Sequence, residues 1–194
     1  MKKIISIIIF MLITACESIP VLTDYQGEGK GYVLLSQAAK TGTEYGLYML
    51  EVRPLDHAKK GYAALKYFQN NTFYGDDRDF DDTESNGIVR LHQFPPGKYE
   101  IYTYQISSQG ASKTWVAPEG SYVQFEVFEG KVTYLGEFLA EAQSAPNLFG
   151  LTIPWGATIS VSDKIERDIK YVSDRLPDAN LNKLINQVPK LSSM

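Results

Sequence analysis

Residues 121–138, SYVQFEVFEGKVTYLGEF, carry the pattern that decides the fold class of this chain. In the first half, apolar and mostly polar side chains alternate, with Val123, Phe125 and Val127 at the apolar positions. Alternation with a period of two places the apolar side chains on one face of a β-strand. The turn Glu129-Gly130-Lys131 separates this run from a second one at 132–138. The stretch therefore predicts two strands joined as a hairpin.

Similar runs, rich in Tyr, Val, Ile, Leu and Phe and separated by Gly, Pro, Asn or Asp, occur along most of the chain. Besides the pair above, we expect strands at 32–37, 45–53, 62–69, 88–94, 99–106 and 157–161. Seven or eight short strands linked by turns predict a mainly β protein. We expect two packed antiparallel sheets, a β-sandwich, with a β-barrel as the alternative.

The carboxyl-terminal residues change to helical spacing. Asp163, followed three residues later by Glu166, forms a capping box. Ile165, Ile169 and Val172 then recur at the spacing of one helix face. A second short helix is expected at 181–188, where the apolar residues also share one face. We expect both helices to pack on the sandwich.

The amino terminus has the features of an exported precursor, in the usual order. Lys2 and Lys3 precede a mainly apolar run over residues 4–13, and this run is shorter than the about 20 residues that a membrane-spanning helix needs. The next residues, Ile13-Thr14-Ala15-Cys16, resemble the bacterial lipobox. The resemblance implies that Cys16 receives lipid and that the peptide bond before it is cut. Cys16 is the only cysteine in 194 residues, which agrees with a lipidation site.

This resemblance implies an address and a division of the chain. Several acyl chains on one cysteine hold a protein durably on a membrane. Glu17 replaces the Asp that favours inner-membrane retention, so the resemblance implies a lipid anchor in the cell outer membrane, with the domain facing the periplasm. We expect a signal peptide at 1–15, a lipidated tether at 16–29, the β-sandwich at 30–162 and the helical segment at 163–194.

Residues 87–110, GIVRLHQFPPGKYEIYTYQISSQG, are similar to a motif of prealbumin-like and carboxypeptidase-regulatory-like β-sandwiches. In those domains a strand, a Pro-Pro-Gly turn and a second strand follow one another, which implies a turn at Pro95-Pro96-Gly97 and an inward Tyr99. The motif indicates a fold and no activity. The order of the motifs and the terminal helices also resembles uncharacterised lipoproteins of Gram-negative bacteria.

An acidic stretch offers the main candidate metal ligands, Asp77, Asp79 and Asp81. Alternating carboxylates suit calcium, but an EF-hand alignment places Asp82 at the required glycine and Ile88 at the required glutamate. The expectation is a solvated loop without metal.

The two histidines do not have the spacing of a zinc site either. His92 is expected at the surface, on the strand face opposite Leu91. We expect no cofactor.

Aromatic residues provide the remaining candidate binding surface. Tyr102 and Tyr104 are expected to share one strand face, with Trp115 nearby, as in surfaces that bind sugars or proteins. Such residues can equally fill the core.

The function predicted from these features is a non-enzymatic envelope protein that binds a protein partner or supports an assembly. The sequence shows no nucleophile elbow, phosphate loop or dinucleotide motif. A net charge of −4 without a basic cluster argues against nucleic acid. The alternatives are a glycan- or peptidoglycan-binding module and, third, a hydrolase whose acid and base lie apart in sequence.

Overall fold

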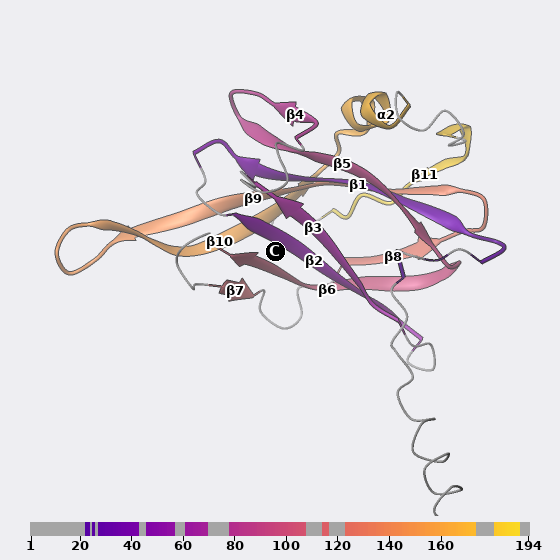
Figure 1. Cartoon of the computed structure of the whole chain (residues 1–194), viewed down its shortest axis with the longest axis horizontal. Helices are drawn as coiled ribbons and strands as arrows, with labels where there is room; N and C mark the ends of the chain where they lie inside the picture. Colours follow the sequence, from indigo (N-terminus) through magenta and orange to yellow (C-terminus); the bar gives the residue numbers. More distant parts are fainter. Residues whose placement is uncertain are drawn as a thin grey trace, which may run out of the picture.

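The structure is a computed structural model that describes residues 22–23, 25, 27–42, 46–56, 61–69, 78–107, 114–116, 123–173 and 181–190. Within these residues the chain is mainly β, as predicted, with two sheets and one α-helix (Figure 1). Cys16 and residues 1–15, where we expect a signal peptide, lie outside the described residues, as do His57 and Asp77.

The first sheet has the strand order β10-β9-β1-β5-β4, with β11 added beside β9. Its strands are β1 (Gly31–Lys40), β4 (Phe80–Asp81), β5 (Ser85–Phe94), β9 (Val132–Pro146), β10 (Thr152–Ser162) and β11 (Leu184–Asn186). The second sheet has the order β3-β2-β6-β7. β8 and β7 pair with the same edge of β6, β8 with residues 97–101 and β7 with residues 105–107. Its strands are β2 (Leu47–Pro54), β3 (Ala63–Phe68), β6 (Gly97–Ser107), β7 (Thr114–Val116) and β8 (Val123–Val127). Three of these strands, β4, β7 and β11, have at most three residues each. They bring the number of described strands above the predicted seven or eight.

The first sheet is mixed, so the purely antiparallel arrangement that we expected is wrong. β1 runs parallel to β9, and β11 also runs parallel to β9. Parallel neighbours require a long connection, and residues 41–131, which include every strand of the second sheet, lie between β1 and β9 in the sequence.

The predicted hairpin at 121–138 is also wrong, although its two strands exist. β8 pairs with β6 in the second sheet, and β9 pairs with β1 in the first. The turn between them therefore joins the two sheets, and the Thr133 hydroxyl donates to the Glu126 carbonyl oxygen at 2.8 Å across it. Alternation defined each strand, but the pairing partner depended on packing. In the β8–β6 pair, Phe125 stacks on Tyr99 at 5.6 Å between ring centroids.

The main hydrophobic core contains residues of both sheets. Phe94 of the first sheet meets Tyr99 of the second edge-to-face at 5.4 Å. Tyr99 is buried, and its hydroxyl donates to the Pro95 carbonyl oxygen at 2.7 Å. A second cluster lies on the other face of the first sheet, where Leu34, Phe80 and Val172 are buried together.

One of the two predicted helices is present. α2 (Ile165–Ser173) begins beside the predicted capping box and covers the second cluster. The second helix is wrong, since residues 181–183 form one turn of 3-10 helix and β11 follows. β10 leaves β9 at the Ser162–Glu137 pair, so the edge of β9 at 132–134 is open. β11 satisfies the backbone groups of that edge, which outweighs helix formation in so short a segment.

The packed domain begins earlier than the expected boundary at residue 30. Leu22 is 5% exposed within the main core, and its N–H donates to the Tyr62 carbonyl oxygen at 2.8 Å. Residue 22 therefore belongs to the fold rather than to a tether. In the described part of the chain, no helix has both the length and the apolar character needed to cross a bilayer.

Candidate binding sites

A two-stranded arm projects from the first sheet. The pairing of β1 with β9 ends at Ala39–Ala140, whereas β9 continues to Pro146 and pairs there with β10. Six further residues at about 3.4 Å each give a projection of about 20 Å. We call residues 141–157 the arm, and Figure 1 shows it as the long extension on the left.

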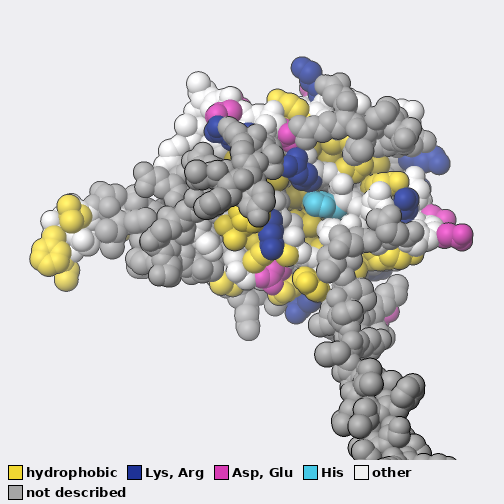
Figure 2. Space-filling model, viewed as in Figure 1, with side chains coloured by type: hydrophobic (Ala, Val, Ile, Leu, Met, Phe, Trp, Pro, Cys, Tyr) yellow, Lys and Arg dark blue, Asp and Glu magenta, His cyan; other side chains and the backbone are white. Residues whose placement is uncertain are grey.

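The tip of the arm is apolar and fully accessible. Leu148 is 101% exposed, Phe149 is 87% exposed and Leu151 is 64% exposed. Figure 2 shows these side chains as the yellow group at the far left. Residues 142–162 contain no Asp, Glu, Lys, Arg or His. Beyond Glu141 at its base, the arm therefore carries no charged residue, and it has large apolar side chains at its end.

The turn at the tip is fixed by Asn147. Its side-chain Oδ1 accepts from the N–H groups of Phe149 and Leu151, at 2.9 and 3.0 Å. Its backbone N–H donates to the Leu151 carbonyl oxygen at 2.8 Å, and its carbonyl oxygen accepts from Gly150 at 2.9 Å. Gly150 has a φ of 76°, a left-handed conformation that suits glycine. The tip is thus a formed turn.

The sequence reasoning missed this arm. The predicted strands ended at residue 138 and resumed at 157, so the intervening residues received no role. Two signals were present, namely the absence of charge over 142–162 and the turn-forming Asn147 and Gly150. Neither signal distinguishes a buried hairpin from an exposed one.

The two tyrosines predicted to share a face point to opposite sides of the second sheet. The register between β2 and β6 shifts, so that Thr103 faces Glu51 and Ile101 faces Val52. Tyr102 is the extra residue of this bulge, which reverses the alternation after it. Tyr104 is consequently buried at 5% exposure, and its hydroxyl donates to the Ala157 carbonyl oxygen at 3.2 Å. Burial raises the pKa of Tyr104.

Tyr102 lies on the outer face of the second sheet, where neighbouring side chains already hold it. Its hydroxyl donates to Glu51, and Gln105 donates to the other oxygen of the same carboxylate. Burial and the bond to Glu51 raise the pKa of Tyr102 to about 12. The Arg53 guanidinium lies 4.6 Å from the ring centroid and donates to Glu100 at 2.6 Å. A sugar stacking on that ring face would have to displace Arg53.

Trp115 lies in β7 with its backbone opposite Ile106, and its side chain is outside the described part of the structure. The structure therefore does not bring Trp115, Tyr102 and Tyr104 together as one described surface.

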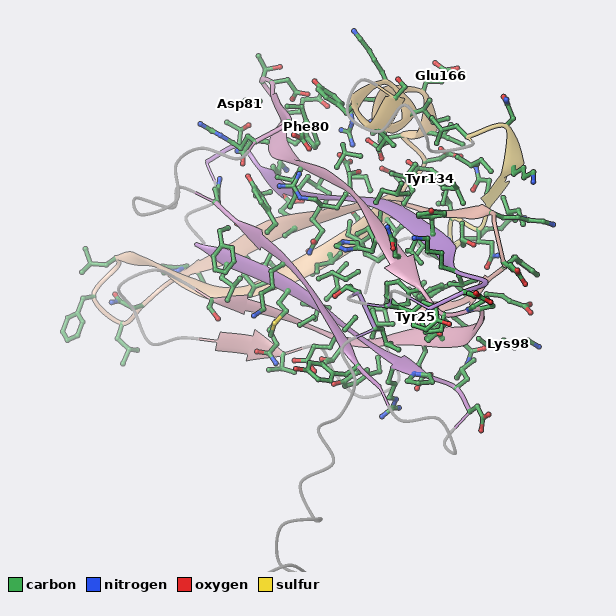
Figure 3. The ribbon with its side chains drawn as sticks, turned by 45° about the vertical axis from the view of Figure 1, so that its right-hand side comes forward. Tyr25, Phe80, Asp81, Lys98, Tyr134 and Glu166 are labelled. Carbon is green, nitrogen blue, oxygen red and sulfur yellow. The ribbon has the colours of Figure 1, made fainter. Side chains whose placement is uncertain are left out.

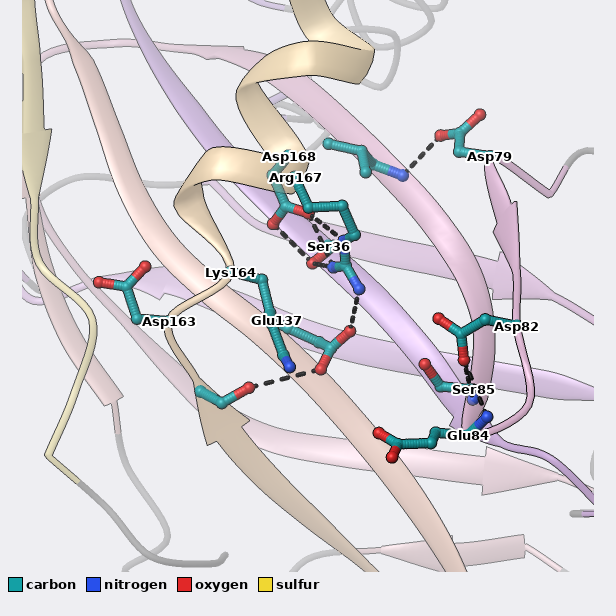
Figure 4. A network of polar contacts seen from close by, with 12 residues as sticks. Ser36, Asp79, Asp82, Glu84, Ser85, Glu137, Asp163, Lys164, Arg167 and Asp168 are labelled. Carbon is teal, nitrogen blue, oxygen red and sulfur yellow. Dashed lines mark hydrogen bonds and ion pairs between the residues drawn. The ribbon is translucent and has the colours of Figure 1, made fainter.

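A buried ionic network lies between α2 and the first sheet (Figure 4). Asp168, which is 0% exposed, accepts from Ser36 and Tyr134 at 2.8 and 2.9 Å through one oxygen. Its other oxygen accepts from Arg167 Nη2 at 2.7 Å and Nε at 2.9 Å. Arg167 also donates to Glu137 at 2.7 Å. These bonds join α2 to both β1 and β9.

The electrostatics of this network suit a structural role. Burial and the charge of Asp168 raise the pKa of Tyr134, which keeps its hydroxyl protonated as a donor. Burial disfavours the Arg167 charge, but Glu137 and Asp168 outweigh it and raise the pKa. Ser36 is fully buried and accepts from Arg167 at 2.9 Å, so no substrate reaches its hydroxyl. Figure 3 shows Tyr134 and Phe80 on the α2 side of the sheet, where Arg167 lies 3.8 Å from the Phe80 ring centroid.

The acidic stretch uses its described carboxylates inside the protein. Asp79 accepts from the Val89 N–H at 2.6 Å, so it occupies part of the open edge of β5. Asp81 pairs with Arg78 at 2.7 Å. Asp82 accepts from the backbone of Ser85 and Glu84, and these two bonds lower its pKa. Among the described residues, no three His, Cys, Asp or Glu side chains are grouped as a metal site.

His92 is partly buried, so the predicted surface position is wrong. Its side chain is on the opposite face of β5 from that of Leu91, as predicted. However, both faces of β5 are covered, one by α2 and the other by the second sheet. Burial lowers the pKa of His92 to about 4. Its Nε2 is buried and has no hydrogen-bond partner among the described residues.

Comparisons with known proteins give little. No family model matches the chain, and no curated protein matches it. A leucine-rich repeat protein from Bacteroides thetaiotaomicron resembles it in structure at 12% identity, with a TM-score of 0.35. The match covers 77% of this chain and 16% of that one. A likeness of this degree carries no statement on fold or function.

Proposed function

We propose that this chain is a lipid-anchored protein of the outer membrane whose periplasm-facing β-sandwich is not an enzyme and presents the arm to a protein partner. The exposure of Leu148, Phe149 and Leu151 at the arm tip carries this proposal. Single exposed apolar residues are common on soluble proteins, but a group of them on a projection marks an interaction site.

The construction of the arm supports the proposal. An isolated two-stranded ribbon is only marginally stable in water, and none of the described side chains at the outer end of this one belongs to the core. Apolar side chains at an exposed tip also lower solubility. Both features agree with a segment that becomes covered when a partner binds.

The arm and the expected anchor belong to opposite ends of the domain. Leu22 pairs with the start of β3, while the end of β3 lies at the arm side, where Tyr67 donates to Asn86 at 2.7 Å. Leu22 follows Cys16 by six positions in the sequence, a distance along the chain of at most about 20 Å. With Cys16 in the membrane, the arm would extend away from the anchored end.

The anchor is tested by intact-mass spectrometry of the full-length protein recovered from membranes. We expect a mass equal to residues 16–194 plus acyl groups, and we expect the acyl groups to be absent in Cys16→Ala. An unmodified wild-type mass would refute the lipid anchor and leave the partner question separate.

Partner binding is tested by photocross-linking in cells, with p-benzoylphenylalanine in place of Phe149. Phe68, an aromatic residue on β3 that is 44% exposed, provides the matched control position. We expect a discrete protein adduct from position 149 and none of the same size from position 68. Equal adducts from both positions, or none from position 149, would refute a role for the arm.

A further inference from the structure

A second candidate surface lies at the end of the domain opposite the arm. Lys98 is near the start of β6, and its carbonyl oxygen accepts from the Leu55 N–H at 2.9 Å. Lys131 precedes β9, and its carbonyl oxygen accepts from the Tyr32 N–H, at the start of β1, at 2.9 Å. Tyr62 directly precedes β3 and is 46% exposed. The strand registers place these residues at one end of the domain, remote from the arm, where Figure 3 shows Lys98.

The chemistry of this end suits the surface of a bilayer. The Lys131 ammonium nitrogen lies 5.4 Å from the centroid of the half-buried Phe128 ring. Lys98 and Lys131 are exposed, and neither has an ion-pair partner among the described residues. Tyrosine and lysine suit the head-group level of a membrane, because each combines an apolar body with a polar end. Exposed Glu28 and Glu129 offset part of the positive charge, so this end alone attracts lipid only weakly.

The short chain before the fold compensates for this weak attraction. Leu22 is buried and its N–H donates to the Tyr62 carbonyl oxygen, so the chain enters the fold beside Tyr62. Cys16 lies six positions earlier, at most about 20 Å along the chain. A lipid on Cys16 would hold this end of the domain within that reach of the head groups. A surface held so close has a high effective concentration, and it therefore needs little affinity to stay in contact.

We propose that Tyr62, Lys98, Phe128 and Lys131 form a basal surface that contacts the head groups of the membrane in which Cys16 is anchored. This inference rests on the lipid anchor of the proposed function and adds a lipid surface as a second partner. The arm suits head groups less well, since residues 142–162 contain no Lys or Arg.

Contact through the basal surface sets the direction of the arm. The 15 residues of β9 begin at this end of the domain and continue into the arm. At about 3.3 Å per residue they span about 50 Å. The basal surface therefore holds the domain upright, with the arm tip about that far from the bilayer.

The test uses full-length acylated protein in vesicles of phosphatidylethanolamine and phosphatidylglycerol, some of which carries a nitroxide on its head group. Cys16 is the only cysteine, and acylation occupies its thiol, so Tyr62→Cys or Phe68→Cys provides a single position for a fluorescent label. The native side chains are 46% and 44% exposed, and they lie six positions apart along one strand, about 20 Å. We expect the nitroxide to quench the label at position 62 at least threefold more than the label at position 68.

Paired charge reversals test the two lysines of the basal surface. Lys98→Glu with Lys131→Glu should lower the quenching at position 62 at least threefold, because carboxylates repel the anionic lipid. Lys66→Glu with Lys170→Glu makes the same change of charge at exposed positions on β3 and α2, and should leave the quenching unchanged. Equal quenching in the two double variants would show that Lys98 and Lys131 do not contact the head groups, which would overturn the inference.

The labels also separate this inference from the proposed function. Equal quenching at positions 62 and 68, or stronger quenching at position 68, in protein whose acyl groups are present in the intact mass would overturn the basal surface and leave the anchor standing. Absence of the acyl groups from the wild-type mass would refute the anchor and, with it, this inference.

Discussion

Replacement of Asp168 by Asn tests the buried network that holds α2 on the first sheet. The wild-type carboxylate accepts four hydrogen bonds, two from Arg167 and one each from Ser36 and Tyr134. Asparagine has the same shape but only one acceptor oxygen. With that oxygen toward Arg167, the hydroxyl protons of Ser36 and Tyr134 lose their acceptor in a fully buried place.

The size of the effect follows from these bonds. Two buried donors left without a partner cost about 1–3 kcal/mol each, and the bonds to Arg167 weaken because their acceptor is no longer charged. Arg167 retains Glu137 as a partner, which limits the loss. We expect the free energy of unfolding to fall by roughly 3–4 kcal/mol, a large part of the 5–15 kcal/mol typical of a domain.

Asp81→Asn is the matched control, because Asp81 also bonds an arginine at 2.7 Å but is 53% exposed. Exposed pairs contribute about 0–1 kcal/mol, so this variant should differ little from the wild type. Urea denaturation at pH 7, followed by tyrosine fluorescence and circular dichroism, measures both variants. Equal losses for Asp168→Asn and Asp81→Asn would refute the assigned role of burial.

Three further predictions concern other parts of the fold. The pKa of His92 is about 4 in the folded protein and about 6.5 when unfolded, so the unfolded state binds more protons between these values. Stability should therefore fall as the pH decreases from about 6.5 to about 4, by up to about 3 kcal/mol more than in His92→Leu, and parallel stability curves for the two proteins would contradict this. A Cβ at Gly87 would lie 2.4 Å from the Gln37 carbonyl oxygen, so Gly87→Ala should destabilise by about 1–3 kcal/mol. In Gly156→Ala the nearest atom is 3.6 Å away, and a loss equal to that of Gly87→Ala would show that the close approach is irrelevant. Asn147→Ala should increase amide hydrogen exchange at Phe149 and Leu151 at least tenfold without changing the melting temperature, and unchanged exchange would mean that the side chain does not fix the turn.

Several elements were predictable because their signals are local. The strand at 88–94 and the helix after Asp163 appeared close to the predicted positions, as β5 and α2. Side-chain periodicity and a capping box reflect geometry within a few residues, so they can be recognised without knowledge of the rest of the chain.

The candidate binding site was predicted less well, because it depends on register and on what surrounds each strand. One extra residue at Tyr102 separated two tyrosines that alternation had placed on one face. Likewise, the covered faces of β5 made His92 a partly buried residue, and the arm became exposed only because β1 ends at Lys40 while β9 continues.

The sequence by itself determined which segments extend, which segment forms the helix and where the chain carries no charge, since these properties belong to neighbouring residues. Only the tertiary structure decided that β8 and β9 enter different sheets, that residues 184–186 join β9 as a strand, and that Leu148 and Phe149 remain in solvent. The physical reason is that strand pairing and burial are settled by contacts between residues far apart in the chain. Their free energies depend on the whole core, and no local pattern records them.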